Sequence, residues 1–193
     1  MRHLRLSALS EREKGYVVGF FIGDGNLFIS KRRGVYRVRF LLGVNEKQVQ
    51  AKLREILSKL LGSFREYTDR STTLCFEVHS KEFVNYLKKT AAKDGSGINE
   101  DLCDLEFLRG LVEGLVDSDG NVKRNYAEIT TANEHLKEKI LRVLNRLGIK
   151  TNLRTFSYST RRGRKVAYRV GFSLNNALFY PAKWEASAAQ TAG

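Results

Sequence analysis

The sequence predicts an α+β fold made of two similar halves, because two features of the chain repeat. A nine-residue segment occurs as Val17–Gly25 and again, in a looser form, as Val112–Gly120. After each copy, the hydrophobic pattern indicates the same order of elements, namely strand, strand, helix, strand, strand and helix. The chain is therefore interpreted as a duplicated unit.

Each copy of the segment is predicted to end a helix, the first at about residues 11–24 and the second at about 105–119. Small residues recur at every fourth position of the two copies, namely Gly15, Gly19 and Gly23, and Gly110, Gly114 and Ser118. This spacing puts them on one helix face, where they allow two helix backbones to approach closely. Packing along these faces would bring the terminal acids, Asp24 and Asp119, close together. One Asp-Gly pair usually marks only a turn, but two carboxylates paired in this way indicate a divalent metal site.

In the first half, two strands are expected around Gly34, at residues 26–33 and 35–44. The second strand alternates apolar side chains with Arg37 and Arg39, which indicates one face in the core and one carrying guanidinium groups. Asn45 is a suitable N-cap for the helix that follows. That helix and the remaining elements of this half are expected at residues 45–61, 64–69, 72–79 and 81–92.

The second half repeats this order, with Asn133 as the N-cap that matches Asn45. Its elements are expected at residues 121–124, 126–132, 133–147, 152–158 and 165–172, followed by a helical segment from about residue 174. In the second of these strands, Tyr126, Glu128 and Thr130 place a charge on the face expected in the core. A bulge or a different register is therefore left open for this strand.

Between the halves, Lys93–Asn99 has the composition of a linker. We therefore expect a first half at 1–92, a linker at 93–103 and a second half at 104–193. Pro181 is expected to break or kink the last helix, and the tail after Trp184 is expected to fray.

The composition favours a polyanionic partner. The chain has 193 residues and a formal net charge of +13, with a pI of about 9.9, which favours nucleic acid first and an anionic membrane second.

Cys75 and Cys103 lack the spacing of a zinc site and are expected to be free thiols. The start of the chain lacks a signal peptide pattern, and the longest apolar stretch, Tyr16–Ile22, is too short to span a bilayer. We therefore expect an intracellular protein, in the cytoplasm of a prokaryote or in an organelle.

Basic and polar residues gather on the predicted strands and hairpins of both halves. The candidate DNA-binding residues are Asn26, Ser30, Arg32, Arg37, Arg39, Lys123, Arg154, Arg161, Arg162, Arg164 and Lys165. Arg37 and Arg39 alternate along a strand, so both can point into a major groove. The run 161–164 is expected to be a hairpin tip that contacts phosphates. On the strand at 72–79, His79 is expected on the DNA-facing side with Thr73, Cys75 and Glu77.

The two motif copies and the elements after them resemble the two-motif LAGLIDADG homing endonucleases. The resemblance covers nearly the whole chain. It implies two pseudo-symmetric αββαββα halves, with the motif helices paired at their interface and the strands forming a β-saddle over double-stranded DNA. It also implies a monomeric enzyme that cleaves both strands of a long asymmetric site by metal-dependent hydrolysis and leaves 3′ overhangs.

Carried onto this sequence, the family pattern assigns catalysis and metal binding to Asp24 and Asp119. The backbone carbonyls of Gly23 and Ser118 are implied as further metal ligands. Mg²⁺ is the expected cofactor, and Mn²⁺ and Ca²⁺ are alternative occupants. Residues that support the site in the family map to Glu46, Glu134, Lys93 and Lys183, the last two being weak candidates.

The chain departs from the family pattern in two ways. Ile22 stands at the sixth motif position, where the signature and the second copy (Asp117) have an acid; this position is usually not the catalytic one. Glu46 and Glu134 stand where the family often has Gln or Lys, and an acid there would repel a phosphate unless it is turned away.

Two other functions remain open. One is an RNA intron maturase or a non-catalytic DNA-binding protein on the same fold, which loss of a motif acid would favour. The other is a general basic nucleic-acid-binding protein, which would need no metal and would leave the glycine-faced helix pair unexplained.

Overall fold

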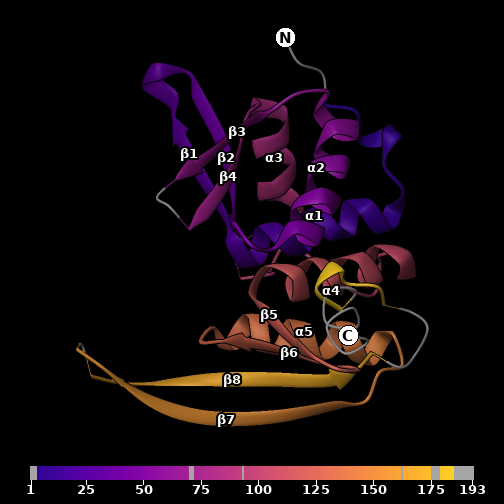
Figure 1. Ribbon diagram of the computed structural model, residues 1–193. Coiled ribbons are helices and arrows are strands. Elements are labelled where there is room, and N and C mark those ends of the chain that lie inside the picture. The colour runs from indigo at the N-terminus through magenta and orange to yellow at the C-terminus, as the bar shows by residue number, and fades with distance from the viewer. Residues whose placement is uncertain (1–3, 70–71, 93, 162, 175–178, 185–193) are drawn as a thin grey trace.

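The computed structural model describes residues 4–69, 72–92, 94–161, 163–174 and 179–184. Each half contains one four-stranded antiparallel sheet, and two helices, α1 and α4, pack against each other at the junction of the halves (Figure 1). The strand orders are β1-β2-β4-β3 and β5-β6-β8-β7, so the second sheet repeats the topology of the first. The α+β fold with two pseudo-symmetric halves is confirmed.

The first half begins with a short 3₁₀ turn and the first motif helix. Its elements are η1 (Leu6–Ala8), α1 (Glu11–Asp24), β1 (Gly25–Ser30), η2 (Lys31–Arg33), β2 (Val35–Gly43), α2 (Lys47–Leu61), β3 (Arg65–Asp69), β4 (Thr73–His79) and α3 (Lys81–Thr90). The first strand was expected to reach residue 33, but it ends at Ser30. Residues 31–33 form a 3₁₀ turn that closes at Gly34, whose φ of 62° is left-handed.

The second half repeats this order with a much longer last hairpin. Its elements are α4 (Leu105–Asp119), β5 (Gly120–Lys123), β6 (Tyr126–Thr131), α5 (Glu134–Arg146), β7 (Thr151–Thr160) and β8 (Gly163–Ser173). The helix expected from residue 174 falls partly outside the described residues. Of the part described, residues 179–181 are not helical and only 182–184, directly after Pro181, form a helical turn.

The N-cap residues explain where three of the helices begin. Ser10 caps α1 in a capping box with Glu13, and the side chain of Asn133 accepts from the Leu136 amide, as expected. The N-cap expected at Asn45 was wrong, because the N-cap of α2 is Glu46 and the helix begins at Lys47. The Glu46 carboxylate instead accepts from the Gly43 amide at 2.8 Å, which ties the helix start to the end of β2.

The core face of each sheet is set by alternation along its central strand. In β2, Val38, Phe40 and Leu42 are buried, as the pattern predicted. In β6, the buried side chains are Ala127 and Ile129. The core face that we assigned to Tyr126, Glu128 and Thr130 was therefore wrong: the strand keeps a continuous register with β8 and turns these three outward.

The two motif helices lie deep in the molecule. Residues 15–22 of α1 and 110–118 of α4 are all buried, which explains the apolar stretch at Tyr16–Ile22. No helix in the described ranges is long and apolar enough to cross a membrane. Cys75 and Cys103 are both free, and Cys75 is buried.

Candidate metal and DNA site

The small residues of the two motifs form the contact between α1 and α4. A Cβ atom built on Gly19 would lie 2.1 Å from the Leu111 carbonyl oxygen, and one on Gly114 would lie 2.1 Å from that of Tyr16. At the other end of the helix pair, a Cβ atom built on Gly15 would lie 1.9 Å from the Phe107 carbonyl oxygen. One built on Gly110 would lie 1.8 Å from that of Arg12. No side chain larger than hydrogen fits at these distances, so the helices touch backbone to backbone.

This packing brings the two motif acids to the same end of the helix pair. Asp24 and Asp119 are the last residues of α1 and α4. A Cβ atom on Gly23, directly before Asp24, would lie 2.0 Å from Ser118 Oγ and 3.4 Å from Asp119 Cβ. The two helix ends therefore meet where β1 and β5 begin, and both acids sit between the two sheets.

A divalent cation fits the donors at this point. Asp119 is exposed, and its carboxylate has no hydrogen bond or ion pair with the residues that the structure describes. Within those residues there is no cluster of three or more His, Cys, Asp or Glu that would form a complete protein ligand set. Mg²⁺ suits such a site, because it commonly binds one or two carboxylates and takes its other ligands from phosphates and water.

Lys183 brings a positive charge to the same place. Its ammonium donates to the carbonyl oxygens of Ser118 and Gly120, both at 3.1 Å. It also pairs with the Glu46 carboxylate at 3.3 Å. Lys183 and Glu46, two of the supporting candidates, are thus brought to the end of the motif helices.

Asp117, at the sixth position of the second motif, holds Lys183 in place. Its carboxylate is 1% exposed and accepts from the backbone amides of Ala182 and Lys183 at 2.8 and 2.9 Å. The Tyr16 hydroxyl donates to it at 3.0 Å. Burial raises the pKa of Asp117, and the charge of Lys52 and the three hydrogen bonds offset this only in part.

Only one of the other two supporting candidates lies in the part of the chain that the structure describes. Glu134 is exposed and pairs with Lys137, on its own helix, at 3.4 Å. Lys93 lies outside the described residues. The two acids that match in the sequence, Glu46 and Glu134, therefore have different surroundings.

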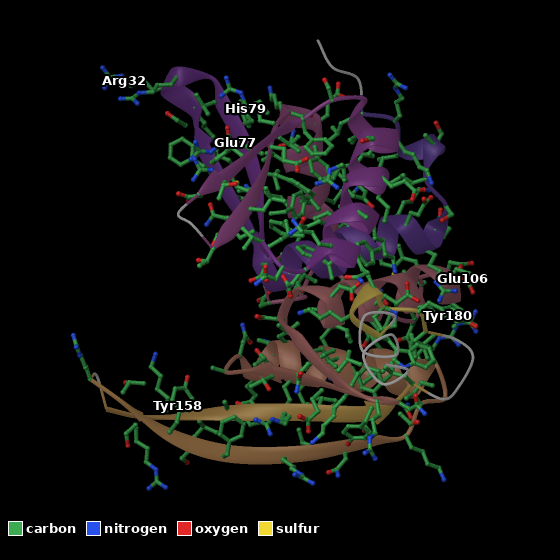
Figure 2. All side chains as sticks on the ribbon, in the orientation of Figure 1. Arg32, Glu77, His79, Glu106, Tyr158 and Tyr180 are labelled. Atoms are coloured by element: carbon green, nitrogen blue, oxygen red, sulfur yellow. The ribbon has the colours of Figure 1, made fainter. Side chains whose placement is uncertain are left out.

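A cluster of ion pairs joins the halves at the opposite end of the motif helices. Arg12 of α1 pairs with Glu106 and Glu113 of α4, and Glu113 is 2% exposed. Lys52 of α2 reaches Glu113 at 3.3 Å and the Tyr180 carbonyl at 2.9 Å. Glu106 and Tyr180 are labelled close to each other in Figure 2.

The predicted DNA-binding residues of the first half share one surface. Asn26 pairs with Arg39, and Phe28 with Arg37, across β1 and β2. Residues directly opposite one another in an antiparallel sheet project to the same face, so these side chains share the face turned away from the core. Ser30 lies at the end of β1 on that face, and Arg32 lies at the outer tip of the hairpin (Figure 2).

In the second half, the predicted residues follow the long β7–β8 hairpin. Arg154 pairs with Arg169, and Tyr158 with Lys165, so Arg154 and Lys165 share a face. Arg164 lies on the other face, because neighbouring residues of a strand alternate. Lys123 is exposed at the end of β5 and lines a pocket with Asn121, Arg124, Tyr126 and Glu128. Arg161 lies in the hairpin turn, as expected, and Arg162 lies outside the described residues.

Sequence reasoning missed the roles of two acids. It passed over Asp117 because the sixth motif position is usually not catalytic. It placed Glu77 on the DNA-facing side of β4 but gave it no task. Glu77 is 5% exposed and pairs with Arg39 at 2.8 Å. An acid at an alternating position, expected on the same side as Arg37 and Arg39, was the available signal.

Comparison with known proteins supports this description. Residues 106–183 match the family described as the LAGLIDADG-like domain. A solved structure of mesophilic variants of the homing endonuclease I-DmoI is similar, with a TM-score of 0.69 and 20% identity, covering 95% of this chain and 98% of that one. The structure of I-DmoI in complex with DNA and Ca has a TM-score of 0.67 and 19% identity, and it covers the same shares of the two chains. The predicted resemblance to the LAGLIDADG homing endonucleases is confirmed in family domain and in fold.

Two further proteins are also similar to this chain. The N-terminal LAGLIDADG domain of DUF199/WhiA has a TM-score of 0.51 and 13% identity, over 88% of this chain and 78% of that chain. A DNA polymerase of Thermococcus hydrothermalis is 25% identical over 146 residues, which is 71% of this chain. The matching part is only 9% of the length of that polymerase.

Proposed function

We propose that this chain is a LAGLIDADG-type homing endonuclease that cleaves both strands of a long, asymmetric DNA site with the help of a divalent cation. The observation that carries the proposal is the backbone contact between α1 and α4. It places Asp24 and Asp119 at one end of the helix pair. Because one chain supplies both acids, it acts as a monomer, and each acid serves one strand.

The residues at the helix ends divide the work of hydrolysis. Asp24 and Asp119 hold the cation, with the carbonyls of Gly23 and Ser118 as further ligands. Bound Mg²⁺ supplies charge neutralisation at the phosphate and a water of lowered pKa. Lys183 already donates to the Ser118 carbonyl, and a carbonyl oxygen has a second lone pair for another partner. The ammonium adds positive charge beside the scissile phosphate, while its pairing with Glu46 keeps that acid from repelling DNA.

The sheets bind the target on either side of this point. The net charge of +13 supplies much of the affinity through phosphates. The side chains along β2 and the β7–β8 hairpin contact base edges or phosphates in the major groove. The two sheets differ in strand length and in residues, so the two half-sites differ and the target is asymmetric. The 3′ overhangs expected from the family belong to this proposal.

The related structures support the use of a divalent cation. I-DmoI or its variants have been described in complex with DNA and Ca, with DNA and Mn, and with target DNA in the presence of Mg. For this chain, Mg²⁺ is the cation we propose, because its ligand preference matches two carboxylates that leave open positions for phosphate and water.

Cleavage of a randomised duplex library tests the function directly. The library is incubated with the protein, with and without Mg²⁺, and the cut ends are sequenced. We expect cuts at one long motif, only with Mg²⁺, and with a constant 3′ overhang. Enrichment of bound duplexes without any cut would favour a maturase or a non-catalytic DNA-binding protein. Binding without any sequence preference would favour a general nucleic-acid-binding protein.

A further inference from the structure

An acid lies at the centre of the surface that we assign to DNA. Glu77 of β4 is directly opposite Arg39 of β2 and Arg65 of β3. The neighbouring pair, Arg37 and His79, shares this face. An exposed carboxylate here would repel the phosphates of a duplex, but Glu77 is 5% exposed and so presents little charge to solvent.

The Glu77 carboxylate binds the side chains around it instead. One oxygen accepts from His79 Nε2 at 2.8 Å. The other accepts from Arg39 Nε at 2.8 Å and from the Tyr67 hydroxyl at 3.3 Å, and Arg37 pairs with it at 3.6 Å. Figure 2 shows Glu77 and His79 side by side on this sheet. Burial alone raises the pKa of Glu77, but the hydrogen bonds from His79 and Arg39 and the charges of Arg39 and Arg37 outweigh it and lower the pKa to about 2.

These bonds leave outward-facing donors and acceptors in fixed positions. Arg39 uses Nε for Glu77, so its two terminal nitrogens are not needed for that contact. A carboxylate only accepts, so His79 Nε2 carries a proton and Nδ1 is the other polar atom of a ring that is 46% exposed. Arg37 is also held from the side, because its guanidinium lies 4.8 Å above the Phe28 ring.

Fixed guanidinium groups are suited to reading guanine. An arginine that donates two hydrogen bonds to O6 and N7 of guanine makes the commonest specific contact in the major groove. A free arginine side chain loses rotamer entropy when it binds, whereas a side chain already held in place loses less. Holding the arginine in place also penalises other orientations of its side chain, in which it would bind another base or a phosphate.

We propose that Glu77 is a positioning residue for target specificity. It holds Arg37, Arg39 and His79 so that they read base edges in the half-site bound by the first half, with Arg39 specifying a guanine. This inference rests on the proposed function, since it concerns the DNA site of the same enzyme.

The test measures cleavage of every single-base variant of the target found in the library experiment. Wild-type protein is expected to prefer guanine by about 10-fold or more at one position of one half-site. In Glu77→Gln this preference falls below about 3-fold, while preferences in the other half-site stay unchanged. If Glu77→Gln lowers the rate equally on all targets and keeps the guanine preference, Glu77 is merely structural and the proposal is overturned.

Two further variants keep the test decisive if Glu77→Gln folds poorly. Arg39→Ala has no side-chain donor for guanine, so it is expected to lose the same guanine preference, and adding Glu77→Gln to it should cause no further loss. Glu128→Gln is the matched control: Glu128 pairs with Arg169 at 3.8 Å on the second sheet. A change at the same base pair in Glu128→Gln would contradict the proposal. So would a target found by the wild type that carries no preferred guanine in either half-site.

Failure of the function itself looks different. If wild-type protein yields no motif in the library, both the endonuclease and the role of Glu77 are overturned. If a motif is cut but Arg39→Ala and Glu77→Gln leave every base preference intact, only the role of Glu77 is overturned.

Discussion

The two motif helices pack alike but differ at their sixth position. Ile22 in the first helix is 4% exposed and Asp117 in the second is 1% exposed, so both are core positions. Ile22 packs in the hydrophobic core, whereas Asp117 holds the backbone amides of residues 182 and 183. A duplicated sequence motif thus fixes the helix packing in both halves, while one changed residue gives only the second helix the means to anchor Lys183.

Loss of either motif acid should have the largest effect on cleavage, and this effect should be the same for both halves. Asp24→Asn and Asp119→Asn each remove a carboxylate from the proposed cation site, which is worth several kcal/mol of transition-state stabilisation. We expect double-strand cleavage to fall roughly 10³-fold or more, with DNA binding retained. Linearisation of a plasmid carrying the target measures double-strand cleavage, and a gel-shift assay measures DNA binding. A variant that linearises the plasmid at the normal rate would show that its acid is not catalytic.

Filling the helix contact should also affect both halves equally. Gly19→Val and Gly114→Val each drive a side chain into a backbone carbonyl that lies 2.1 Å from the Cβ position. We expect each to lower the free energy of unfolding by about 3 kcal/mol or more, as measured by urea denaturation. Gly148→Asn is the control, because Gly148 has a φ of 72°, has open space around it, and Asn tolerates this conformation. Equal, small losses in all three would contradict the close packing.

Substitution at the sixth position should separate the halves. Asp117→Asn replaces one accepting oxygen by a donor, so at least one of the three groups that donate to Asp117 loses its partner. We expect a loss of about 1–3 kcal/mol in the free energy of unfolding. We also expect slower cleavage of one strand, because Lys183 is no longer held. Ile22→Val should cost only about 1 kcal/mol and leave both strands cut alike. Nicked plasmid that accumulates with Ile22→Val, or fails to accumulate with Asp117→Asn, would contradict this difference.

The pH dependence of stability gives the smallest but most direct contrast between two buried acids. The folded pKa of Glu77 is lowered from 4.5 to about 2, so its stabilisation is present above 4.5 and is lost as the pH falls through about 2. The folded pKa of Asp117 is raised above 3.8, so its contribution is most favourable below 3.8 and declines as the pH rises through the folded value.

The free energies of unfolding of wild type, Glu77→Gln and Asp117→Asn, measured from pH 2 to 7, test this. The loss caused by Glu77→Gln should be largest above pH 4.5. The loss caused by Asp117→Asn should be largest below pH 3.8. Parallel losses for the two variants across this range would show that the two carboxylates have similar surroundings in the folded protein.

Several errors of sequence reasoning share one cause. Asn45 has the residue type of an N-cap, but Glu46, which is held by the Gly43 amide and by the distant Lys183, is the N-cap instead. In β6, each face of the run Tyr126–Thr131 carries one bulky side chain, Tyr126 on one face and Ile129 on the other. Pairing with β8 decides that Ala127 and Ile129 are buried, because they lie opposite Phe172 and Val170. Local pattern cannot distinguish such alternatives when both satisfy it.

The sequence by itself determined the architecture and the place of the motif acids. Small residues at every fourth position permit only a close helix pair, and alternation along Val35–Gly43 separates a core face from an arginine face. These are properties of neighbouring residues on one helix or one strand. The tertiary structure alone decided that Lys183 meets Glu46 and Ser118, that Asp117 anchors it, and that Glu77 gathers Arg37, Arg39 and His79. Apart from Glu77 and His79, which lie two residues apart on β4, those contacts join residues distant in the chain. Their partners depend on how the halves, the sheet and the end of the chain come together.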